Sequence, residues 1–370
     1  MQKVSLTRLI VAWVTVICFF IFGSSWLSDL GSPVVLTGLF LWLFAVILWS
    51  AFGVVHEAEE LAALLGEPHG TLILTLSIVI IEVALVAAVM LGAKEAPTLG
   101  RDTMFAVLMI ILNGVVGLGL LIGGYKFREQ SYNLQGSASY LSVLIPLTTV
   151  PLILPNFTTS TEGGTLTTFQ SVAVAGFTIV LYGIFLITQT GRHRAFYVHP
   201  DALEATKADH SGEDAVEIAK HTVFKHTILL ILNILPIVLL SKSLAKILDH
   251  GINYLQLPAA LGGVVVAAIV FTSEAISSLK AVARNDLQRA INLCLGSAAS
   301  TVGLTVPAVL IIGLITGQPV VLGLKPTEMT LLAITLLLST LTFSNKRTTL
   351  LEGAVHLTVF FVYITLVFSP

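Results

Sequence analysis

Charged side chains are scarce in this chain of 370 residues, in which 19 Lys and Arg and 21 Asp and Glu make up 11% of the sequence. Globular domains carry roughly 25% charged residues. A surface with so few charges cannot keep a protein of this size in water. The net charge of −2 provides no basic field for nucleic acid. Soluble enzymes and nucleic-acid-binding proteins are therefore excluded.

Cysteine and catalytic motifs are also lacking. The two cysteines, Cys18 and Cys294, both lie in apolar runs, which predicts packed hydrophobic side chains and excludes a disulfide framework or a zinc site. The segment at 56–60, HEAEE, lacks the second histidine of the H-E-x-x-H metalloprotease motif. A G-x-S-x-G turn and a phosphate-binding Walker loop are missing as well. The sequence predicts neither an enzyme nor a resident cofactor.

Apolar runs are abundant: the hydrophobic fraction is 55% and the mean hydropathy is +0.94. A membrane-spanning helix needs about 20 mostly apolar residues. The sequence contains eleven such runs, at 9–28, 33–53, 70–92, 103–124, 138–155, 166–189, 224–241, 257–279, 287–316, 327–344 and 349–368. Pro307 predicts a tilt or a kink within its run. We predict an all-α integral membrane protein of about eleven transmembrane helices, with the lipid bilayer as its solvent.

The distribution of basic residues predicts the orientation. With the N-terminus in the cytoplasm, fourteen of the 19 Lys and Arg lie in cytoplasmic stretches and five on the other side, as the positive-inside rule requires. The first run resembles a signal peptide at its basic start, but it is long and lacks an A-x-A cleavage pattern, which favours a retained helix. We expect a multi-pass protein of a bacterial cytoplasmic membrane with an external C-terminus.

One long polar stretch, at 190–223, separates the sixth and seventh runs. It contains six acidic residues and four histidines, so it is either a solvated connector or a segment that senses cations or pH. It divides the chain into an extra N-terminal helix at 1–32, a first five-helix half at 33–189 and a second five-helix half at 224–370. Because five is an odd number, similar halves would insert with opposite orientation and form an inverted repeat.

Each half contains a similar polar pattern. When Asp102 is aligned with Asp286, Asn113 falls on Ser297, eleven residues after each Asp. The topology predicted above places the two Asp-containing loops on opposite sides of the membrane, as inversion requires.

Each half also contains one isolated acid within an apolar run. Glu82 and Glu274 are the only charges in the runs 72–91 and 257–279. An ionisable group at the centre of a bilayer costs about 2.5–3.5 kcal/mol, and such residues usually face the interior of the bundle or a watery cavity. The alternative role for either acid is a protonated carboxyl that hydrogen-bonds a neighbouring helix. Two acids in corresponding positions favour a cation site.

Hydroxyl side chains lie near both acids. Thr75 shares a helical face with Glu82, and Ser277 and Ser278 share a face with Glu274. In the next run, Ser297 begins a stripe of hydroxyls with i, i+4 spacing, and Ser300 lies beside it. Oxygen ligands of this kind are preferred by hard cations such as calcium and sodium. Hydroxyls that bond to their own helix are the common alternative.

Several of these segments together resemble the cation/calcium exchanger superfamily. They are GEPHGTLILTLS at 66–77 followed by Glu82, the SEA at 273–275, the GSAAS at 296–300, and the LEG at 351–353. They are similar to the two α-repeats of bacterial ChaA-type calcium/proton antiporters, and the resemblance extends over nearly the whole chain. It implies a core of ten helices in two inverted five-helix repeats, and export of calcium, sodium or potassium in exchange for protons.

The resemblance also implies a set of functional residues. The cation- and proton-binding candidates are Glu82, Glu274, Thr75, Ser77, Asn113, Ser273, Ser297 and Ser300, with the two acids as metal ligands. The accessory candidates are His56, Glu59, Glu352 and His356. The G-N-x-x-E pattern of eukaryotic relatives is replaced by Ile and Val before Glu82, and by Val and Phe before Glu274, so the choice between calcium, sodium and potassium stays open.

Two roles of the acid pair, and two roles of His356, can be distinguished in advance. In an antiporter, two protons or one calcium ion would neutralise the acid pair, and only the loaded states would cross a dry intermediate. In a cation channel, the same acids would form a selectivity site, and current would flow without coupled proton movement. His356, which follows Glu352 by one helical turn, could relay protons or hydrogen-bond a neighbouring helix. The sequence predicts the antiporter.

Overall fold

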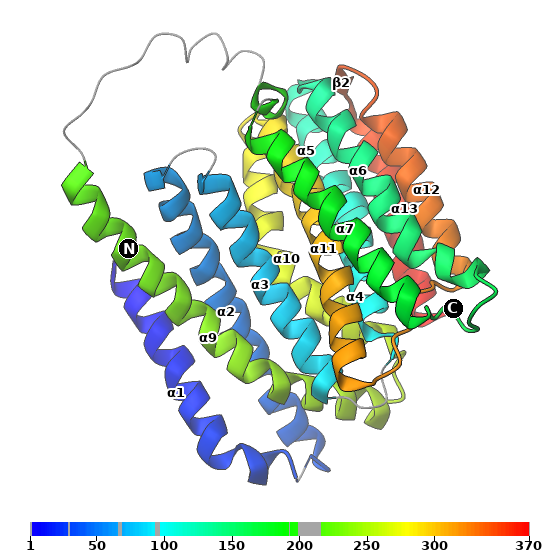
Figure 1. Ribbon diagram of the computed structural model, residues 1–370. Helices are drawn as coiled ribbons and strands as arrows, with labels where there is room; N and C mark the ends of the chain where they lie inside the picture. Colours follow the sequence, from blue (N-terminus) through cyan, green and yellow to red (C-terminus); the bar gives the residue numbers. More distant parts are fainter. Residues whose placement is uncertain are drawn as a thin grey trace. The chain divides into compact units, whose positions relative to one another are not determined.

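The computed structural model describes residues 2–28, 30–65, 69–92, 97–191, 193–198 and 216–369. Each of the eleven apolar runs coincides with a helical segment (Figure 1). The helices are α1 (Gln2–Trp26), α2 (Pro33–Leu65), α3 (His69–Gly92), α4 (Leu99–Met109), α5 (Val116–Phe127), α6 (Leu134–Leu152), α7 (Thr168–Thr190), α9 (Val216–Tyr254), α10 (Ala260–Ala283), α11 (Leu287–Thr316), α12 (Pro326–Thr342) and α13 (Leu350–Phe368). A π-helical segment, η1 (Ile110–Val115), joins α4 to α5 in one run.

Short elements connect these helices. They are the 3-10 turns η2 (Leu154–Phe157) and η3 (Arg194–Tyr197), and the strands β1 (Gln130–Ser131) and β2 (Arg347–Thr348). The two strands pair antiparallel, with Gln130 opposite Thr348. Most of the predicted linker, at 199–215, lies outside the described residues.

Eight helical segments within the described part are long and apolar enough to cross a membrane. Two of the other predicted spans correspond to shorter apolar segments, Leu76–Ala87 of α3 and Pro326–Thr342 of α12. The remaining one is α6, which contains Pro146 and Pro151. The prediction of an all-helical membrane protein is confirmed. The helices α2 and α9 are 33 and 39 residues long, so each continues beyond the apolar run that predicted it.

The chain forms two compact units, and each unit contains helices from both halves of the sequence. Unit 1 comprises Met1–Leu99 and Ser211–Ser273, and unit 2 comprises Gly100–His210 and Glu274–Pro370. In unit 1, α2 packs along α9, α3 packs against both, and α1 packs on α2 and α9. Leu43, Ile47 and Leu61 of α2 are almost fully buried there. Unit 1 therefore has its own apolar core.

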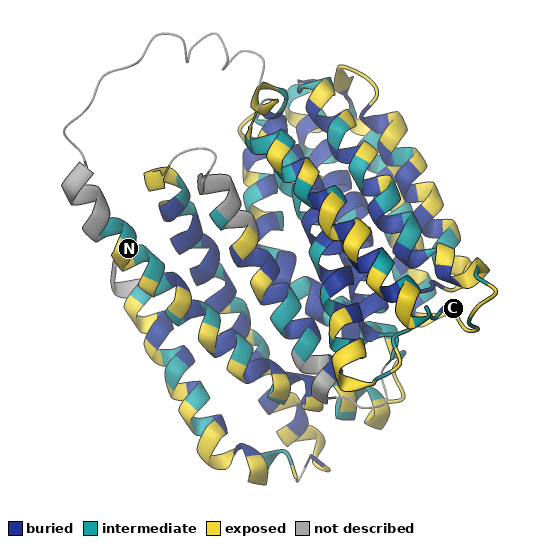
Figure 2. Ribbon diagram, in the orientation of Figure 1, coloured by how far each residue is buried: buried dark blue, intermediate teal, exposed yellow. Residues whose placement is uncertain are grey.

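Unit 2 is built around α11, on which most residues between Leu287 and Gly313 are buried (Figure 2). This helix continues through Pro307 and packs against α6 and α7. Elsewhere in the unit, α5 packs against α13 at three glycines: Gly117, Gly124 and Gly353. A Cβ added at Gly353 would lie 2.5 Å from the backbone nitrogen of Leu121, so the two helix backbones approach as closely as only glycine allows.

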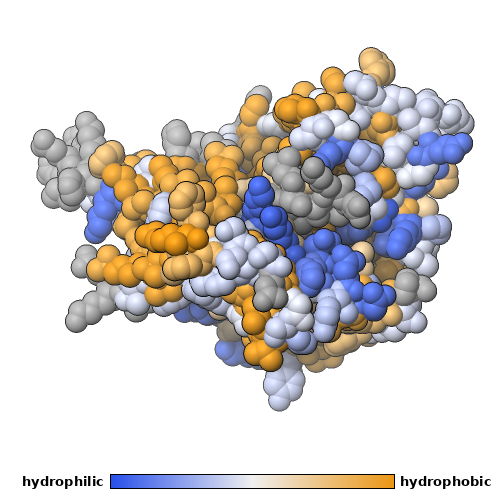
Figure 3. All heavy atoms as spheres, turned by 90° about the horizontal axis from the view of Figure 1, so that it is seen from below, coloured by the Kyte–Doolittle hydropathy of each residue, from blue (hydrophilic) through white to orange (hydrophobic). Residues whose placement is uncertain are grey.

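Large apolar side chains are exposed on the outer helices. Phe20 on α1 and Phe169 on α7 have 90% and 80% of their surface accessible. Figure 3 shows a face on which apolar side chains cover broad areas. Extended apolar surface of this kind marks a membrane-interacting protein, and it is consistent with helices that face lipid.

Candidate functional site

Glu274 and Ser297 form the most direct polar contact among the predicted site residues. Glu274 lies on α10 and is 5% exposed. Its Oε1 accepts a hydrogen bond of 2.6 Å from the hydroxyl of Ser297 on α11. One turn later, Ser300 donates its hydroxyl to the backbone oxygen of Ser297 at 3.0 Å. The helices α10 and α11 thus meet at a buried carboxylate that accepts a hydrogen bond from a hydroxyl.

The start of α11 is fixed by its own sequence. The side chain of Asp286 caps this helix by accepting a hydrogen bond of 3.1 Å from the backbone N–H of Arg289. Such a cap satisfies one of the backbone donors that every helix leaves unpaired at its N-terminus. Eleven residues further on, the same helix carries Ser297.

Glu82 is the corresponding acid of unit 1. It lies on α3 and is fully buried, with 0% of its surface exposed. Ser77 on the same helix is buried, and its hydroxyl donates to the backbone oxygen of Ile73 at 2.7 Å. Thr75 also belongs to α3, and its side chain lies outside the described part. In this structure the hydroxyl of Ser77 therefore bonds to the backbone of its own helix.

Ser273 lies on α10 next to Glu274 and is 3% exposed. Its hydroxyl has no hydrogen-bond partner in the described part of the chain. A buried polar atom of this kind is costly unless it is paired. The hydroxyl is therefore available to a bound ion or water.

Asn113 lies within η1 and is fully buried. Its Nδ2 donates to Oγ1 of Thr335 on α12 at 2.8 Å, and its Oδ1 lies 3.1 Å from Nδ1 of His356 on α13. The other ring nitrogen of His356, Nε2, lies 3.0 Å from Oγ1 of Thr342. The structure thus joins a predicted ligand and a predicted accessory residue in one network, which we call the Asn113 network: Asn113, His356, Thr335 and Thr342.

The remaining accessory residues lie on α2 and α13, whereas the two acids lie on α3 and α10. Glu352 caps its own helix, because its Oε2 accepts hydrogen bonds from the backbone N–H and the hydroxyl of Thr349 at 2.9 and 2.6 Å. His56 and Glu59 are half-buried on α2. Between them lies Glu57, which sequence reasoning did not select and which is only 2% exposed.

Glu57 belongs to a charged cluster that holds α1 in unit 1. Its Oε1 lies 3.8 Å from Nη2 of Arg8 on α1, and its Oε2 lies 2.7 Å from Nδ1 of His226 on α9. Arg8 also donates from Nε to Oδ1 of Asn233 on α9 at 3.1 Å. Ser5 donates its hydroxyl to Glu57 at 3.4 Å. We call these residues the Arg8 cluster.

Sequence reasoning missed the Arg8 cluster because it treated Arg8 only as an orienting charge at the start of the first span. A signal was available: Glu57 lies between two residues chosen as candidates. The π-helical geometry of η1 was missed as well, and no sequence pattern announced it. Single-turn π segments are rare and occur frequently at functional sites.

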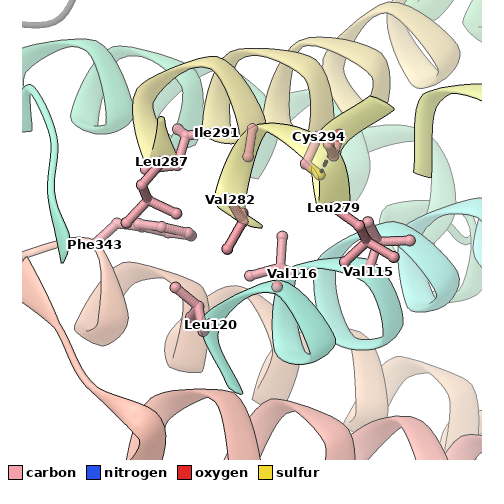
Figure 4. A pocket seen from close by; sticks show the side chains of 12 residues that line it. Val115, Val116, Leu120, Leu279, Val282, Leu287, Ile291, Cys294 and Phe343 are labelled. Carbon is pink, nitrogen blue, oxygen red and sulfur yellow. Dashed lines mark hydrogen bonds between the residues drawn. The ribbon is translucent and has the colours of Figure 1, made fainter. Parts of the chain in front are cut away.

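Neither a titratable cluster in the described residues nor the cavity beside α10 and α11 adds a metal site. The described residues contain no group of three or more His, Cys, Asp or Glu able to hold a metal ion. A cavity of about 10 Å³ lies between α5, α10 and α11, and its labelled side chains in Figure 4 are almost all apolar. Cys294 lies on its wall within 3.5 Å of the Ser278 hydroxyl, as a packed side chain. This space is too small and too apolar for an ion.

These features define a class: a polytopic helical membrane protein in which each half of the sequence places a buried acid within an apolar run. The sequence profile of the family described as "Sodium/calcium exchanger protein" matches residues 35–191 and again residues 225–369. The chain therefore belongs to the sodium/calcium exchanger protein family, a family of transporters and not of enzymes.

The chain is also similar to named bacterial transporters. It is 37% identical to the sodium-potassium/proton antiporter ChaA of Escherichia coli (strain K12) over 98% of this chain and 96% of that protein. It is 40% identical to the putative ionic transporter y4hA of Sinorhizobium fredii over 87% of this chain and 86% of that protein. A Ca²⁺/H⁺ antiporter of Aphanothece halophytica is 26% identical over 67% of this chain and 68% of that protein.

Solved structures share the fold. The structure described as native YfkE has a TM-score of 0.71 at 17% identity, and the match covers 98% of this chain and all of the other. The H⁺/Ca²⁺ exchanger CAX has a TM-score of 0.67 at 12% identity, with 98% of this chain and 88% of the other covered. At these identities the likeness shows the arrangement of the helices alone.

Proposed function

We propose that this protein is a secondary active cation/proton antiporter that exports calcium, sodium or potassium in exchange for protons. The supporting observation is the pair of buried acids, Glu82 and Glu274, one within each of the two segments that the family profile matches. The named relatives support the reaction class, since ChaA is a sodium-potassium/proton antiporter and the Aphanothece protein a Ca²⁺/H⁺ antiporter.

The mechanism follows from the cost of moving charge into a region without water. Desolvation penalises the ionised form of a carboxyl group, and two ionised carboxylates in one site repel each other. An empty, doubly charged site would therefore cross the closed intermediate only at high cost. Two protons, one divalent cation or two monovalent cations would each remove that charge. Coupling follows, because only loaded sites change access.

Each predicted ligand has a role in this scheme. Glu82 and Glu274 would bind either protons or the metal cation. The hydroxyls of Ser297 and Ser273 would add oxygen ligands at Glu274, and Ser300 would fix the backbone oxygen of Ser297. Hard cations prefer this oxygen-rich shell.

The two halves would be related as inverted repeats. Asp102 lies in the first turn of α4 and Asp286 caps α11, so each begins a helix that carries a site residue eleven positions later. With the same offset, Gly119 falls on Gly303. These correspondences support a repeat in which the two halves insert in opposite directions, with the N-terminus in the cytoplasm and the extra helix α1 outside the ten-helix core.

The experiment is cation-driven proton flux with purified protein in liposomes, comparing calcium, sodium and potassium against a pH gradient. Glu82→Gln and Glu274→Gln should each abolish flux, while Glu162→Gln, at an exposed loop carboxylate, should leave it unchanged. Each variant must elute as a monodisperse peak before its flux is compared. Undiminished exchange in both buried variants would eliminate the proposal.

A channel would give a different result in the same liposomes. Cation current would then flow without coupled proton movement, and a pH gradient alone would not drive cation uptake. An antiporter must accumulate the cation against its own gradient when protons flow the other way.

A further inference from the structure

Neutral groups face the ring of His356 in the Asn113 network: the amide oxygen of Asn113, the hydroxyl of Thr342 and the backbone of Leu112. The orientation of the Asn113 amide determines the proton positions. The hydroxyl of Thr335 and Nδ2 of Asn113 both donate to the sulfur of Met109 at 3.7 Å, so the Thr335 oxygen is left to accept from Nδ2 at 2.8 Å. The atom of Asn113 that faces His356 is then the amide oxygen, which can only accept. Nδ1 of His356 must therefore carry the proton, and Nε2 must accept from the hydroxyl of Thr342.

This arrangement determines the orientation of an otherwise symmetric side chain. Rotating the amide of Asn113 by half a turn would place its oxygen against the sulfur of Met109, which has no hydrogen to donate, and its NH₂ group against Nδ1 of His356. An amide oxygen has two lone pairs, and the bond from Nδ1 uses one of them. The other is left for a cation. His356 and Thr335 together keep the oxygen of Asn113 turned toward α13.

The network belongs to the same unit as the Glu274 contact. The π segment that carries Asn113 packs on α11, the helix that carries Ser297, and the Asp102 and Asp286 alignment pairs Asn113 with Ser297 in the two halves. π segments frequently mark functional positions because they rotate a side chain out of the regular helical register. The whole network is buried: Asn113, His356 and Thr335 are each 0% exposed, and Thr342 is 3% exposed.

We propose that His356, as the Nδ1–H tautomer, is a positioning residue that fixes the side-chain oxygen of Asn113 as a ligand of the transported cation. The inference rests on the proposed antiport and names one determinant of cation affinity within it. His356 does not touch the cation. Outer residues that orient a ligand typically change metal affinity by about 10- to 100-fold when they are removed.

Two amide substitutions separate the two ring nitrogens of His356. In asparagine the amide nitrogen lies two bonds from Cβ, as Nδ1 does in histidine; in glutamine it lies three bonds away, as Nε2 does. His356→Asn therefore retains a donor for Asn113, and His356→Gln retains a group opposite Thr342. Thr342→Val removes the hydroxyl that pairs with Nε2 of His356, and Thr342→Ser keeps it.

The transport arm measures the apparent KM for the cation and the maximal rate of cation-driven proton flux in liposomes. His356→Gln and His356→Leu should raise KM about 10-fold or more, with little change in the maximal rate. His356→Asn and Thr342→Ser should stay close to the wild type, and Thr342→Val should lie in between. Equal loss in the Asn and Gln variants, or retention in Gln with loss in Asn, would overturn the proposal.

A second arm does not depend on transport. ¹⁵N NMR of histidine-labelled protein should show one signal, absent from every His356 variant, with a protonated Nδ1 and an unprotonated Nε2. A protonated Nε2 at that signal would overturn the assignment even if exchange is normal. Failure of the antiport itself is recognised separately, because the wild type would then show no coupled flux while the NMR signal could still report the tautomer.

Discussion

Each unit contains a buried polar cluster that joins its helices, and the two clusters differ in charge. In the Arg8 cluster of unit 1, the carboxylate of Glu57 lies between Arg8 and His226, and three helices meet at it. In the Asn113 network of unit 2, the groups are neutral: His356 joins Asn113 and Thr342 through an imidazole, an amide and a hydroxyl. Removing one partner of a buried ion pair leaves an uncompensated buried charge, which is strongly destabilising. Removing one partner in a neutral network costs about one hydrogen bond.

The difference matches what each cluster holds. The Arg8 cluster attaches α1, the helix outside the predicted ten-helix core, to α2 and α9. The Asn113 network instead joins η1, α12 and α13, which are all part of that core. Gly53 makes room for the charged cluster, since a Cβ there would lie 2.3 Å from Nε of Arg8. Charge in unit 1 therefore fixes a helix, and the neutral network of unit 2 orients a single amide.

The largest expected effect comes from breaking the charged cluster. Glu57→Ala would leave Arg8 buried without its carboxylate, and removing one partner of a buried ion pair costs about 3–5 kcal/mol. We expect a marked fall in the thermal unfolding temperature of the detergent-solubilised protein. The double variant Arg8→Met with Glu57→Leu should recover much of the loss, because no charge stays buried.

The matched control for this prediction is the exposed pair in unit 2. Arg347 and Glu129 form a salt bridge of 2.7 Å with side chains that are 69% and 50% exposed. Glu129→Ala should cost about 0–1 kcal/mol. If Glu57→Ala lowered the unfolding temperature no more than Glu129→Ala, the ion pairs of the Arg8 cluster would not hold α1 in place.

The second prediction concerns the close approach of α5 and α13, which supports the neutral network. In Gly353→Ala, the new Cβ would meet backbone atoms, the nitrogen of Leu121 at 2.5 Å and the oxygen of Gly117 at 2.8 Å. Backbone cannot yield as a side-chain end can, so the helices must separate, at a cost of about 1–3 kcal/mol. Thermal unfolding monitored by size-exclusion chromatography measures this cost.

Gly38→Ala provides the contrast, because a Cβ there would have nothing within 4 Å. In a helix interior, alanine is favoured over glycine by roughly 0.5–1 kcal/mol, so this variant should be neutral or slightly more stable. Equal destabilisation at both positions would show that the loss at Gly353 does not arise from the contact between α5 and α13.

The sequence was informative about the helices because long apolar runs between charges have few alternatives in a membrane. It misplaced the ends of α2 and α9. Counting apolar residues stopped at 53 and 241, where charged residues such as Glu59 and Lys242 follow, yet these residues are good helix formers. The helices therefore continue to Leu65 and Tyr254.

The sequence indicates candidate site residues where the chemistry is unusual for its surroundings. A lone acid in an apolar run is costly, and this selects Glu82 and Glu274, which the structure buries; their role as ligands stays a prediction. Partners were harder to predict, because long-range pairs such as Arg8 with Asn233 join segments 225 positions apart. Glu352 was selected as an accessory residue of the cation site. In the structure its carboxylate caps its own helix, in the T-x-x-E pattern that begins a helix.

The smallest expected effect tests the hydrogen bond between Asn113 and Thr335 in the neutral network. Thr335→Val removes the oxygen that accepts from Nδ2 of Asn113 while keeping the shape of the side chain. Hydrogen bonds between helices in a membrane contribute about 0.6 kcal/mol on average, and Nδ2 keeps a contact of 3.7 Å with the sulfur of Met109. We expect a loss of stability of about 0.6–1 kcal/mol in thermal unfolding.

The control is Thr358→Val, at an exposed threonine that bonds its own helix, and it should change nothing measurable. A loss of stability in Thr335→Val as large as that in Glu57→Ala would mean that removing one partner costs as much in the neutral network as in the Arg8 cluster. The two clusters would then differ in their residues and not in how they respond to the loss of a partner.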